Sequence, residues 1–489
     1  MNYAALFHAT LTETILEVAA LVVLVFDLGL LRKAASKTRV AAAALLGVAG
    51  CIAALWSLVS SAGAGMSNGS EVLLAAGGTA AVAQVVILLL TALTLMLFVD
   101  AEFTRNPGEY VSVILMAAAG GILVSAAQDL LVIFVGLELL SVGLYILTAF
   151  AKKSEKSAES SLKYYLFGGM SAAFLLFGFS YLYGLSGSTS LPLVVEGVNS
   201  SAAHGGMPLV LVALVMIAAG LGFKVAAVPF QFWAPDTYEG APAPAAAFIA
   251  SVSKVASFAL LISIGSAVLP AAGIHASWTL ILVLLSAASM VFGNLAALAQ
   301  TSVRRLLAYS AMAHAGYILL GVAYLTGSSA LPQAILYYVI TYGLTTIAAF
   351  GVIGIVERAA GSDHLDAFLG LQKRSPLLAA VLLVLLLSLA GIPPLVGFWA
   401  KFNLFAAVLG AGAGKLPFAL VALAIAMSAV SLYYYLQVLK RVFVMPAVDD
   451  RPVKAHPAAL AVLLFIAAAV LALGCLPALL QSWIGAFFA

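Results

Sequence analysis

Apolar segments separated by short polar connections run along the whole chain. Each is about the length that an α-helix needs to cross a bilayer, roughly 20 residues. We therefore expect an all-α polytopic membrane protein with about fourteen transmembrane helices and no soluble domain of useful size. The expected spans are 12–31, 40–61, 78–99, 110–127, 130–150, 162–184, 208–230, 242–269, 276–297, 305–326, 331–356, 377–412 (broken), 416–439 and 457–481.

Composition supports this interpretation. Hydrophobic residues make up 64% of the chain and charged residues 8%, whereas soluble domains carry about 25% charged residues. Cys51 and Cys475 lie in apolar stretches far apart, so neither a disulfide framework nor a metal site is indicated. Arg32 and Lys33 follow the first apolar run, the opposite order from a cleaved signal peptide. We expect the first span to be retained.

The basic residues alternate between the two sides of the membrane. Of 22 Lys and Arg residues, seventeen fall in connections on one side, Lys415 lies on the other, and four lysines lie within spans. By the positive-inside rule, both termini face outward, which would be the periplasmic side if the chain lies in a bacterial inner membrane. Segment 186–207 is then expected to be an outer loop. The seventeen are Arg32, Lys33, Lys37, Arg39, Arg105, Lys152, Lys153, Lys156, Arg304, Arg305, Arg358, Lys373, Arg374, Lys440, Arg441, Arg451 and Lys454.

The order of spans indicates an internal repeat. Spans four to eight and nine to thirteen form two groups of five, and an odd number of spans inverts the second copy. The fourth helix of each group is broken, by Pro229 in the seventh span and by Pro393 and Pro394 in the twelfth. We expect four units: N-terminal helices 1–3 (1–109), two inverted repeats (110–270 and 276–444) and a last helix (457–489).

Charged side chains within the spans are the candidates for function, because each is costly in a bilayer. Glu138 lies about 13 Å past Asp129 along a helix, near mid-membrane. Lys224, before the break at Pro229, is its candidate partner. Burial favours release of the lysine's proton and a nearby glutamate opposes it, so moving the two together or apart would switch proton affinity. The alternative is a static ion pair.

Two further lysines lie at membrane depth. Lys254 is near the middle of its span, among serines that could hold water; alternatively it pairs with a backbone carbonyl at a helix irregularity. Lys401 follows the second break, on the outer half, where it suits a proton exit; alternatively it snorkels to the surface.

For two further candidates, a structural role is weighed equally against a role in proton transfer. Lys163 either takes part in proton uptake or snorkels toward the inner face beside its neighbouring lysines. His314 either relays a proton through its two ring nitrogens or is a hydrogen-bonded core residue between Tyr309 and Tyr317. Arg304 and Arg305 are expected only to anchor the tenth span at the inner face. The chain has no P-loop, GxGxxG motif, cysteine cluster or paired haem histidines, so we expect no redox chemistry and no ATP use in it.

These residues resemble a known family. The runs KVAAVPFQFWAPDTYEGAPAPAAAFIASVSK (224–254), AGIPPLVGFWAKF (390–402) and GLELLSVGLYIL (136–147) are similar to the antiporter-like membrane subunits of respiratory complex I. The resemblance covers the whole chain. The segment PFQFWAPDTYEGAP and the lysine at position 401 fit the subunit N group, since subunit M is expected to have a glutamate there.

The resemblance implies roles for the residues singled out above. It implies a Glu138–Lys224 pair, a central Lys254, an outer Lys401 and a further lysine at Lys163, whereas His314 aligns less well. It implies proton translocation coupled to NADH:quinone electron transfer in other subunits, which would hold FMN, iron–sulfur clusters and quinone, with no cofactor in this chain. The expected partners are other membrane subunits, the lipid bilayer and protons, not nucleic acid.

Three alternatives stay open at this point. The chain could be a subunit of a multi-subunit sodium/proton antiporter, which has no redox partner. It could be a membrane scaffold whose buried charges only fix helix packing. A chloroplast-type relative that takes electrons from ferredoxin is also compatible with this sequence.

Overall fold

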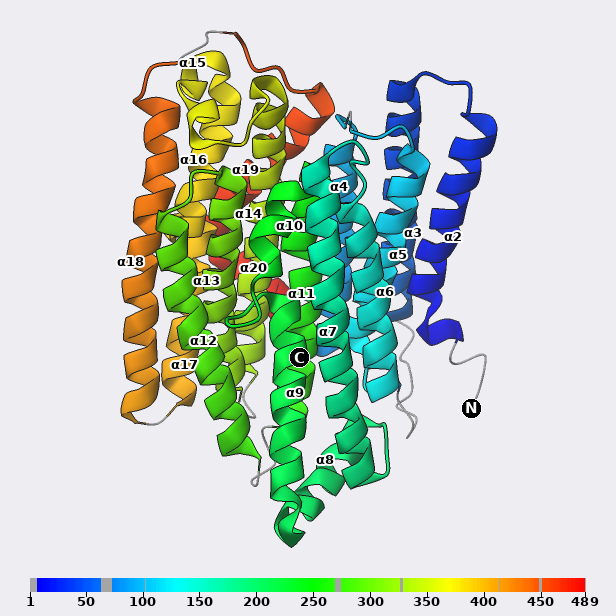
Figure 1. The fold of residues 1–489 in the computed structure, drawn as a ribbon, viewed down its shortest axis with the longest axis vertical. Coiled ribbons are helices and arrows are strands. Elements are labelled where there is room, and N and C mark those ends of the chain that lie inside the picture. Colours follow the sequence, from blue (N-terminus) through cyan, green and yellow to red (C-terminus); the bar gives the residue numbers. More distant parts are fainter. Residues whose placement is uncertain are drawn as a thin grey trace.

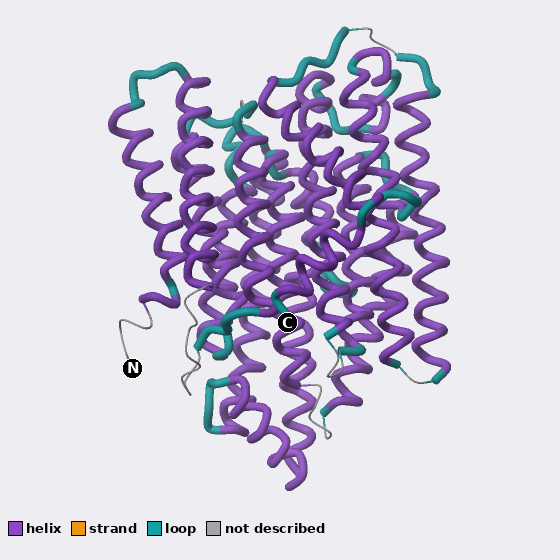
Figure 2. Tube along the Cα trace, turned by 180° about the vertical axis from the view of Figure 1, so that it is seen from behind, coloured by secondary structure: helices purple, strands orange, loops and turns teal. Residues whose placement is uncertain are grey.

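The computed structural model describes residues 7–62, 73–101, 103–268, 274–325, 329–412, 414–447 and 451–488. Within these ranges the chain is helical, and extended pairing is limited to isolated bridges. Long helices run side by side through the molecule (Figure 1), and the view from behind shows the same arrangement (Figure 2). The predicted all-α class is confirmed.

The described residues contain twelve helices long and apolar enough to cross a membrane. The short α2 continued by η1 and the interrupted pair α16–α17 supply two more crossings, so the predicted order of about fourteen spans is found. The bounds are α2 (Leu11–Val25), η1 (Phe26–Leu30), α3 (Ser36–Ala62), α4 (Gly78–Phe98), α5 (Pro107–Ala126), α6 (Leu130–Thr148), α7 (Glu155–Ser186), α8 (Leu191–Ser201), η2 (Ala202–Gly206), α9 (Met207–Val225), α10 (Trp233–Gly240), α11 (Ala243–Val268), α12 (His275–Leu298), α13 (Val303–Ala323), α14 (Ala330–Ala360), η3 (Leu365–Phe368), α15 (Leu371–Arg374), α16 (Pro376–Ala390), α17 (Val396–Ala411), α18 (Lys415–Phe443), α19 (Pro457–Cys475) and α20 (Pro477–Ala486).

The connections rich in lysine and arginine lie at one end of the bundle. We call it the basic end; it is at the top of Figure 1, where α15 and the α2–α3 connection lie. The opposite end carries α8. The expected loop 186–207 lies at that opposite end, but most of it is helical. Leu191, Val194 and Val198 are buried at helical spacing, a pattern that the surrounding glycines and serines obscured.

Polar side chains fix where several helices begin. Asp129 accepts hydrogen bonds from the amides of Leu131 and Val132 at the start of α6. Ser154 caps α7 and Ser302 caps α13 in the same way. Such caps satisfy amides that have no partner inside the helix, and they place the first turns of these helices at defined levels.

The seventh predicted span is interrupted as expected. Helix α9 ends at Val225, and the chain resumes as α10 only at Trp233. Ala226 has φ +58°, a left-handed conformation that costs a residue with a side chain about 1–2 kcal/mol. The Val228–Pro229 peptide bond is cis, and Pro229 offers no backbone donor. Lys224 is therefore placed at a free helix end inside the bundle.

The twelfth predicted span is interrupted in a corresponding way. Helix α16 ends at Ala390, and α17 begins at Val396 after a break that contains the cis Pro393–Pro394 bond. Gly391, at the end of α16, has φ +86°. The division of the chain into two inverted repeats stays a prediction; the two breaks are consistent with it.

Replacing Gly391 by alanine is expected to disturb Lys401. The left-handed φ strains any L side chain by about 1–2 kcal/mol, and an added Cβ would lie 3.0 Å from Cδ and 3.2 Å from Nζ of Lys401. We expect a lower melting temperature of the assembled protein than for Gly410→Ala. At Gly410, in α17, a Cβ would meet nothing within 4 Å. Equal melting temperatures for the two variants would contradict this packing.

Two helices form the centre of the bundle. Side chains of α11 and α13 are buried nearly all round, and these helices carry Lys254 and His314. The last predicted span, 457–481, is in fact two helices, since α19 ends at Cys475 and the shorter α20 starts at Pro477. A proline at the start of α20 accounts for the division.

Candidate functional site

Lys224 lies in the last turn of α9 and points to α6. Its Nζ donates a hydrogen bond of 2.6 Å to Oγ of Ser141 and lies 3.5 Å from Oε1 of Glu138. The Lys224 side chain is 8% exposed and that of Glu138 is 30% exposed. The predicted pair is therefore present, with the lysine enclosed and the glutamate partly at the surface of the chain. The negative end of the α9 helix dipole also favours a cation there.

Lys254 is buried in the middle of α11. Its Nζ donates to the carbonyl oxygen of Val225, the last residue of α9. Two of the neighbouring serines, Ser251 and Ser253, donate hydrogen bonds to carbonyls of their own helix, and each hydroxyl oxygen can still accept one. The contact with Val225 is the backbone pairing that the sequence offered as an alternative, and it brings Lys254 to the break beside Lys224.

Lys401 is buried in α17, so the snorkelling alternative is wrong. Its Nζ donates to the carbonyls of Leu389 at 3.0 Å and Ala390 at 2.9 Å, the last residues of α16, and to Oγ of Ser428 at 2.7 Å. Lys254 and Lys401 thus share one arrangement, in which a buried lysine binds the carbonyl end of a broken helix. Such ends are common places for cations in membrane transporters.

His314 is buried in α13 between tyrosines from other helices. Its Nδ1 lies 2.8 Å from the hydroxyl of Tyr338 on α14, and its Nε2 lies 3.4 Å from the hydroxyl of Tyr435 on α18. The expected neighbour Tyr317 contacts the ring edge-on, without a hydrogen bond to it among the described contacts. Both ring nitrogens face hydroxyl groups, so the imidazole is placed to take up a proton on one nitrogen and release it from the other.

A small cavity of about 10 Å³ lies between His314 and the break in the twelfth span. This is about the space that one water molecule needs. Its lining includes Thr341, Thr345 and Ser388 beside His314, together with Leu389, whose carbonyl binds Lys401. The cavity therefore lies beside the histidine and is lined by a residue whose carbonyl binds the lysine.

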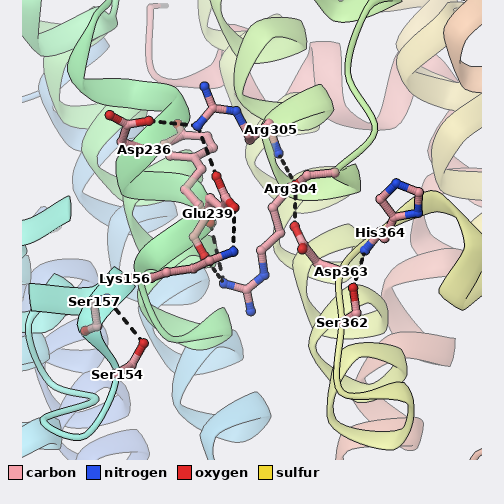
Figure 3. A network of polar contacts seen from close by, with 12 residues as sticks. Ser154, Lys156, Ser157, Asp236, Glu239, Arg304, Arg305, Ser362, Asp363 and His364 are labelled. Carbon is pink, nitrogen blue, oxygen red and sulfur yellow. Dashed lines mark hydrogen bonds and ion pairs between the residues drawn. The ribbon is translucent and has the colours of Figure 1, made fainter. Parts of the chain in front are cut away.

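Lys163 does not join this row of buried groups. It is 40% exposed at the basic end and forms ion pairs with Glu159, at 2.7 Å, and with Asp236 of α10, at 2.8 Å. Asp236 also pairs with Arg305 of α13, at 2.7 Å. Figure 3 shows the surrounding network. The expectation that the two arginines only anchor their own span is wrong, because both also bind α10.

The two carboxylates of α10 are held ionised by these contacts. Partial burial acts to raise the pKa of Asp236, but hydrogen bonds from Lys163 and Arg305 outweigh it and lower that pKa below its ordinary value. For Glu239, partial burial is likewise outweighed by hydrogen bonds from Lys156 and Arg305, and the pKa is lowered. Both groups are charged at neutral pH.

The network therefore makes a pH-dependent contribution to stability with a defined sign. Because the folded pKa of Asp236 lies below its unfolded value, the contribution is complete above the unfolded value, about 4, and is lost as the pH falls through the folded one. We expect the melting temperature of Asp236→Asn to lie below that of the wild type by the same amount at pH 8 and pH 6, and the gap to narrow in more acidic buffer. A gap that closes between pH 8 and pH 6 would contradict the assignment.

A larger cavity of about 500 Å³ opens at the basic end. Charged side chains at its wall include Glu239, Arg304 and Glu357, while Gly351 and Gly354 of α14 lie along its apolar part. Ala243 and Pro244, at the start of α11, also line this cavity, and the charged groups around it favour water there.

Several contacts in the site have no clear signal in the sequence. Ser141 binds Lys224, and Ser428 binds Lys401. Tyr338 and Tyr435 lie against the ring nitrogens of His314. Each of the four lies in an apolar run, like many other serines and tyrosines. Only their position opposite a charged residue distinguishes them. Among the described residues, no group of three His, Cys, Asp or Glu side chains is arranged to hold a metal ion.

The chain has clear relatives. Residues 127–428 match the family model described as NADH:quinone oxidoreductase/Mrp antiporter, TM. The chain is 48% identical to NADH-quinone oxidoreductase subunit N 2 of Acidobacterium capsulatum, over 99% of both proteins. Both the central spans and the full length are therefore matched.

A solved structure of complex I agrees with this assignment. A chain of respiratory complex I from Thermus thermophilus matches with a TM-score of 0.78 and 36% identity, over 96% of this chain and 98% of that one. A chain of the Mrp complex from Dietzia sp. has a TM-score of 0.79 but 22% identity, over 97% and 96%, so it shows a shared fold. The chain therefore belongs to the family of antiporter-like membrane subunits of NADH-quinone oxidoreductase, in the subunit N group.

Proposed function

We propose that this chain is a proton-translocating membrane subunit of NADH-quinone oxidoreductase, the respiratory complex I. The observation that carries the proposal is the row of buried proton-exchanging groups across one bundle, with lysines at both helix breaks. Ionisable residues at membrane depth indicate a functional site, and chains of them form proton relays in pumps and transporters. In this proposal NADH oxidation and quinone reduction take place in other subunits, which hold FMN, iron–sulfur clusters and quinone.

The contacts support a path with a defined order. Glu138 and Lys224 form the first station, and a change in their separation alters the proton affinity of the lysine. The break after Lys224 offers the carbonyl that binds Lys254. His314, on the central helix α13, lines the small cavity beside the second break. Lys401, at that break, is the last station before release. Lys163 lies in surface ion pairs, so we assign it no transfer step.

The chain's surroundings follow from the same reasoning. A carboxylate that is 30% exposed at membrane depth, Glu138, is costly against lipid, which supports a neighbouring membrane subunit at that surface. The positive-inside rule puts the basic end in the cytoplasm and both termini on the periplasmic side of the bacterial inner membrane. Protons would then be taken up at the basic end, where the larger cavity opens.

A gentle-detergent pull-down of the tagged chain from its native membrane tests the assignment. We expect inhibitor-sensitive NADH:quinone reductase activity to travel with the chain in a very large assembly. A large assembly without NADH oxidation, together with sodium-dependent transport, would favour the antiporter subunit instead. NADH:quinone reductase activity that stays wholly in the unbound fraction would contradict the proposal.

A further inference from the structure

Helix α10 is held from both sides by charged residues that the proton path does not use. Oδ2 of Asp236 binds Lys163, and Oε1 of Glu239 binds Lys156, both from α7, at 2.8 Å each. From α13, Nη1 of Arg305 reaches Asp236 at 2.7 Å and Glu239 at 3.0 Å. Figure 3 shows the Arg305 guanidinium beside the Asp236 carboxylate and above that of Glu239. The short helix thus has a fixed place between α7 and α13.

A second arginine of α13 holds the end of the same helix. Nη1 of Arg304 donates to the carbonyls of Ala241, at 2.5 Å, and Glu239, at 3.2 Å. Its Nη2 binds Glu357 of α14. Arg304 is buried. A guanidinium group suits this place because its planar set of donors satisfies several acceptors at once, and helix C-terminal carbonyls favour a cation.

The opposite end of α10 is attached to Lys224's own helix. Trp233, the first residue of α10, is buried, and its Nε1 donates to the carbonyl of Phe223 at 2.9 Å. Phe223 directly precedes Lys224. The indole also stacks on Tyr164 of α7, with ring centres 4.3 Å apart and planes within 6°. Displacing α10 would therefore shift the last turn of α9.

We propose that Arg304, Arg305 and Trp233 are positioning residues for proton transfer at Lys224. The arginines fix α10 to α13, and the tryptophan fixes the end of α9 to α10. Because α13 also carries His314, one rigid connection sets the place of Lys224 relative to a later part of the path. This inference rests on the proposed function and adds to it the residues that hold Lys224, in the first ion pair of the path, in its place.

The test uses complexes assembled in native membranes, as sealed inverted vesicles. Arg305→Gln removes the link to both carboxylates, and Trp233→Phe keeps the stacked ring but removes the Nε1 donor. We expect each to lower NADH-driven proton pumping per assembled complex by about threefold or more. We expect the double variant to pump no more slowly than the slower of the two single variants, because both substitutions break the same connection from α9 through α10 to α13. Arg441→Gln, which removes an arginine from α18 at the same end, serves as the control and should pump normally.

Several results would overturn this inference. Normal pumping in Arg305→Gln or Trp233→Phe would do so, as would losses that multiply in the double variant. If total pumping falls only in proportion to the amount of assembled complex, the three residues have a structural role alone. Lys224→Met separates the two proposals: if it also pumps normally, the proposed proton path fails, whereas if it alone stops pumping, only the positioning role fails.

Discussion

Lys254→Met is expected to abolish most NADH-driven proton pumping while the complex still assembles. Methionine keeps a similar length and apolar stem but cannot carry a proton. In the described part of the chain Lys254 has no carboxylate partner, and its ammonium binds only the carbonyl of Val225. A proton can therefore leave without breaking an ion pair. Loss of one proton-transfer group typically costs 10²–10⁴-fold in rate, so we expect at least about a tenfold loss. The measurement is acidification of inverted vesicles per assembled complex.

The control for this variant is a neighbouring serine of the same helix. Ser253→Ala removes a hydroxyl that bonds its own helix, to the carbonyl of Ile249, and leaves Lys254 unchanged. It should pump at nearly the wild-type rate. If Lys254→Met pumps as well as Ser253→Ala, the lysine has no part in proton transfer and its contact with Val225 only holds the helices together.

Glu138→Gln is expected to impair both stability and pumping. It leaves Lys224 enclosed with no carboxylate within ion-pair distance among the described residues. Removing one partner of a buried ion pair destabilises a folded protein by about 3–5 kcal/mol. Because Glu138 is partly exposed, we expect a destabilisation at the lower end of this range. We expect a lower melting temperature of the assembled complex and at least about a tenfold fall in pumping.

The double variant Glu138→Gln/Lys224→Met separates the two effects. Without the lysine no unpaired cation is buried, so the melting temperature should return toward that of the wild type. Pumping should stay low because the first station is missing. If pumping returns with stability, the Glu138–Lys224 pair only holds α6 and α9 together, and the static ion pair that the sequence also allowed is the correct interpretation.

Much of the fold could be predicted because one property, helix length in an apolar run, sets each crossing. The prolines at 229, 393 and 394 gave both breaks, and the alternation of basic connections gave the order of spans. The helix within the expected loop 186–207 was missed because glycines and serines obscured its spacing, and the burial of Leu191 and Val194 depends on helices packed against it. Tertiary contacts of that kind have no local signal.

The site was predictable where a single charge stands alone in an apolar run. Lys224, Lys254 and Lys401 were found for this reason. Their partners were harder to find: Lys254 and Lys401 bind backbone carbonyls at breaks in other helices, and any residue has a carbonyl. The roles of Asp236 and Arg305 also depend on α10 lying between α7 and α13, a placement that spacing along the chain does not encode.

The ratio of protons pumped to NADH oxidised tests the central claim most directly. It should be measured at the residual turnover of assembled complexes that carry Lys224→Met, Lys254→Met or Lys401→Met. Because the three lysines are assigned to one path, we expect each variant to lose the same number of protons per NADH, with the Arg441→Gln control unchanged. Assembled complexes that keep the full ratio in Lys224→Met and Lys254→Met would contradict the proposed path through this chain.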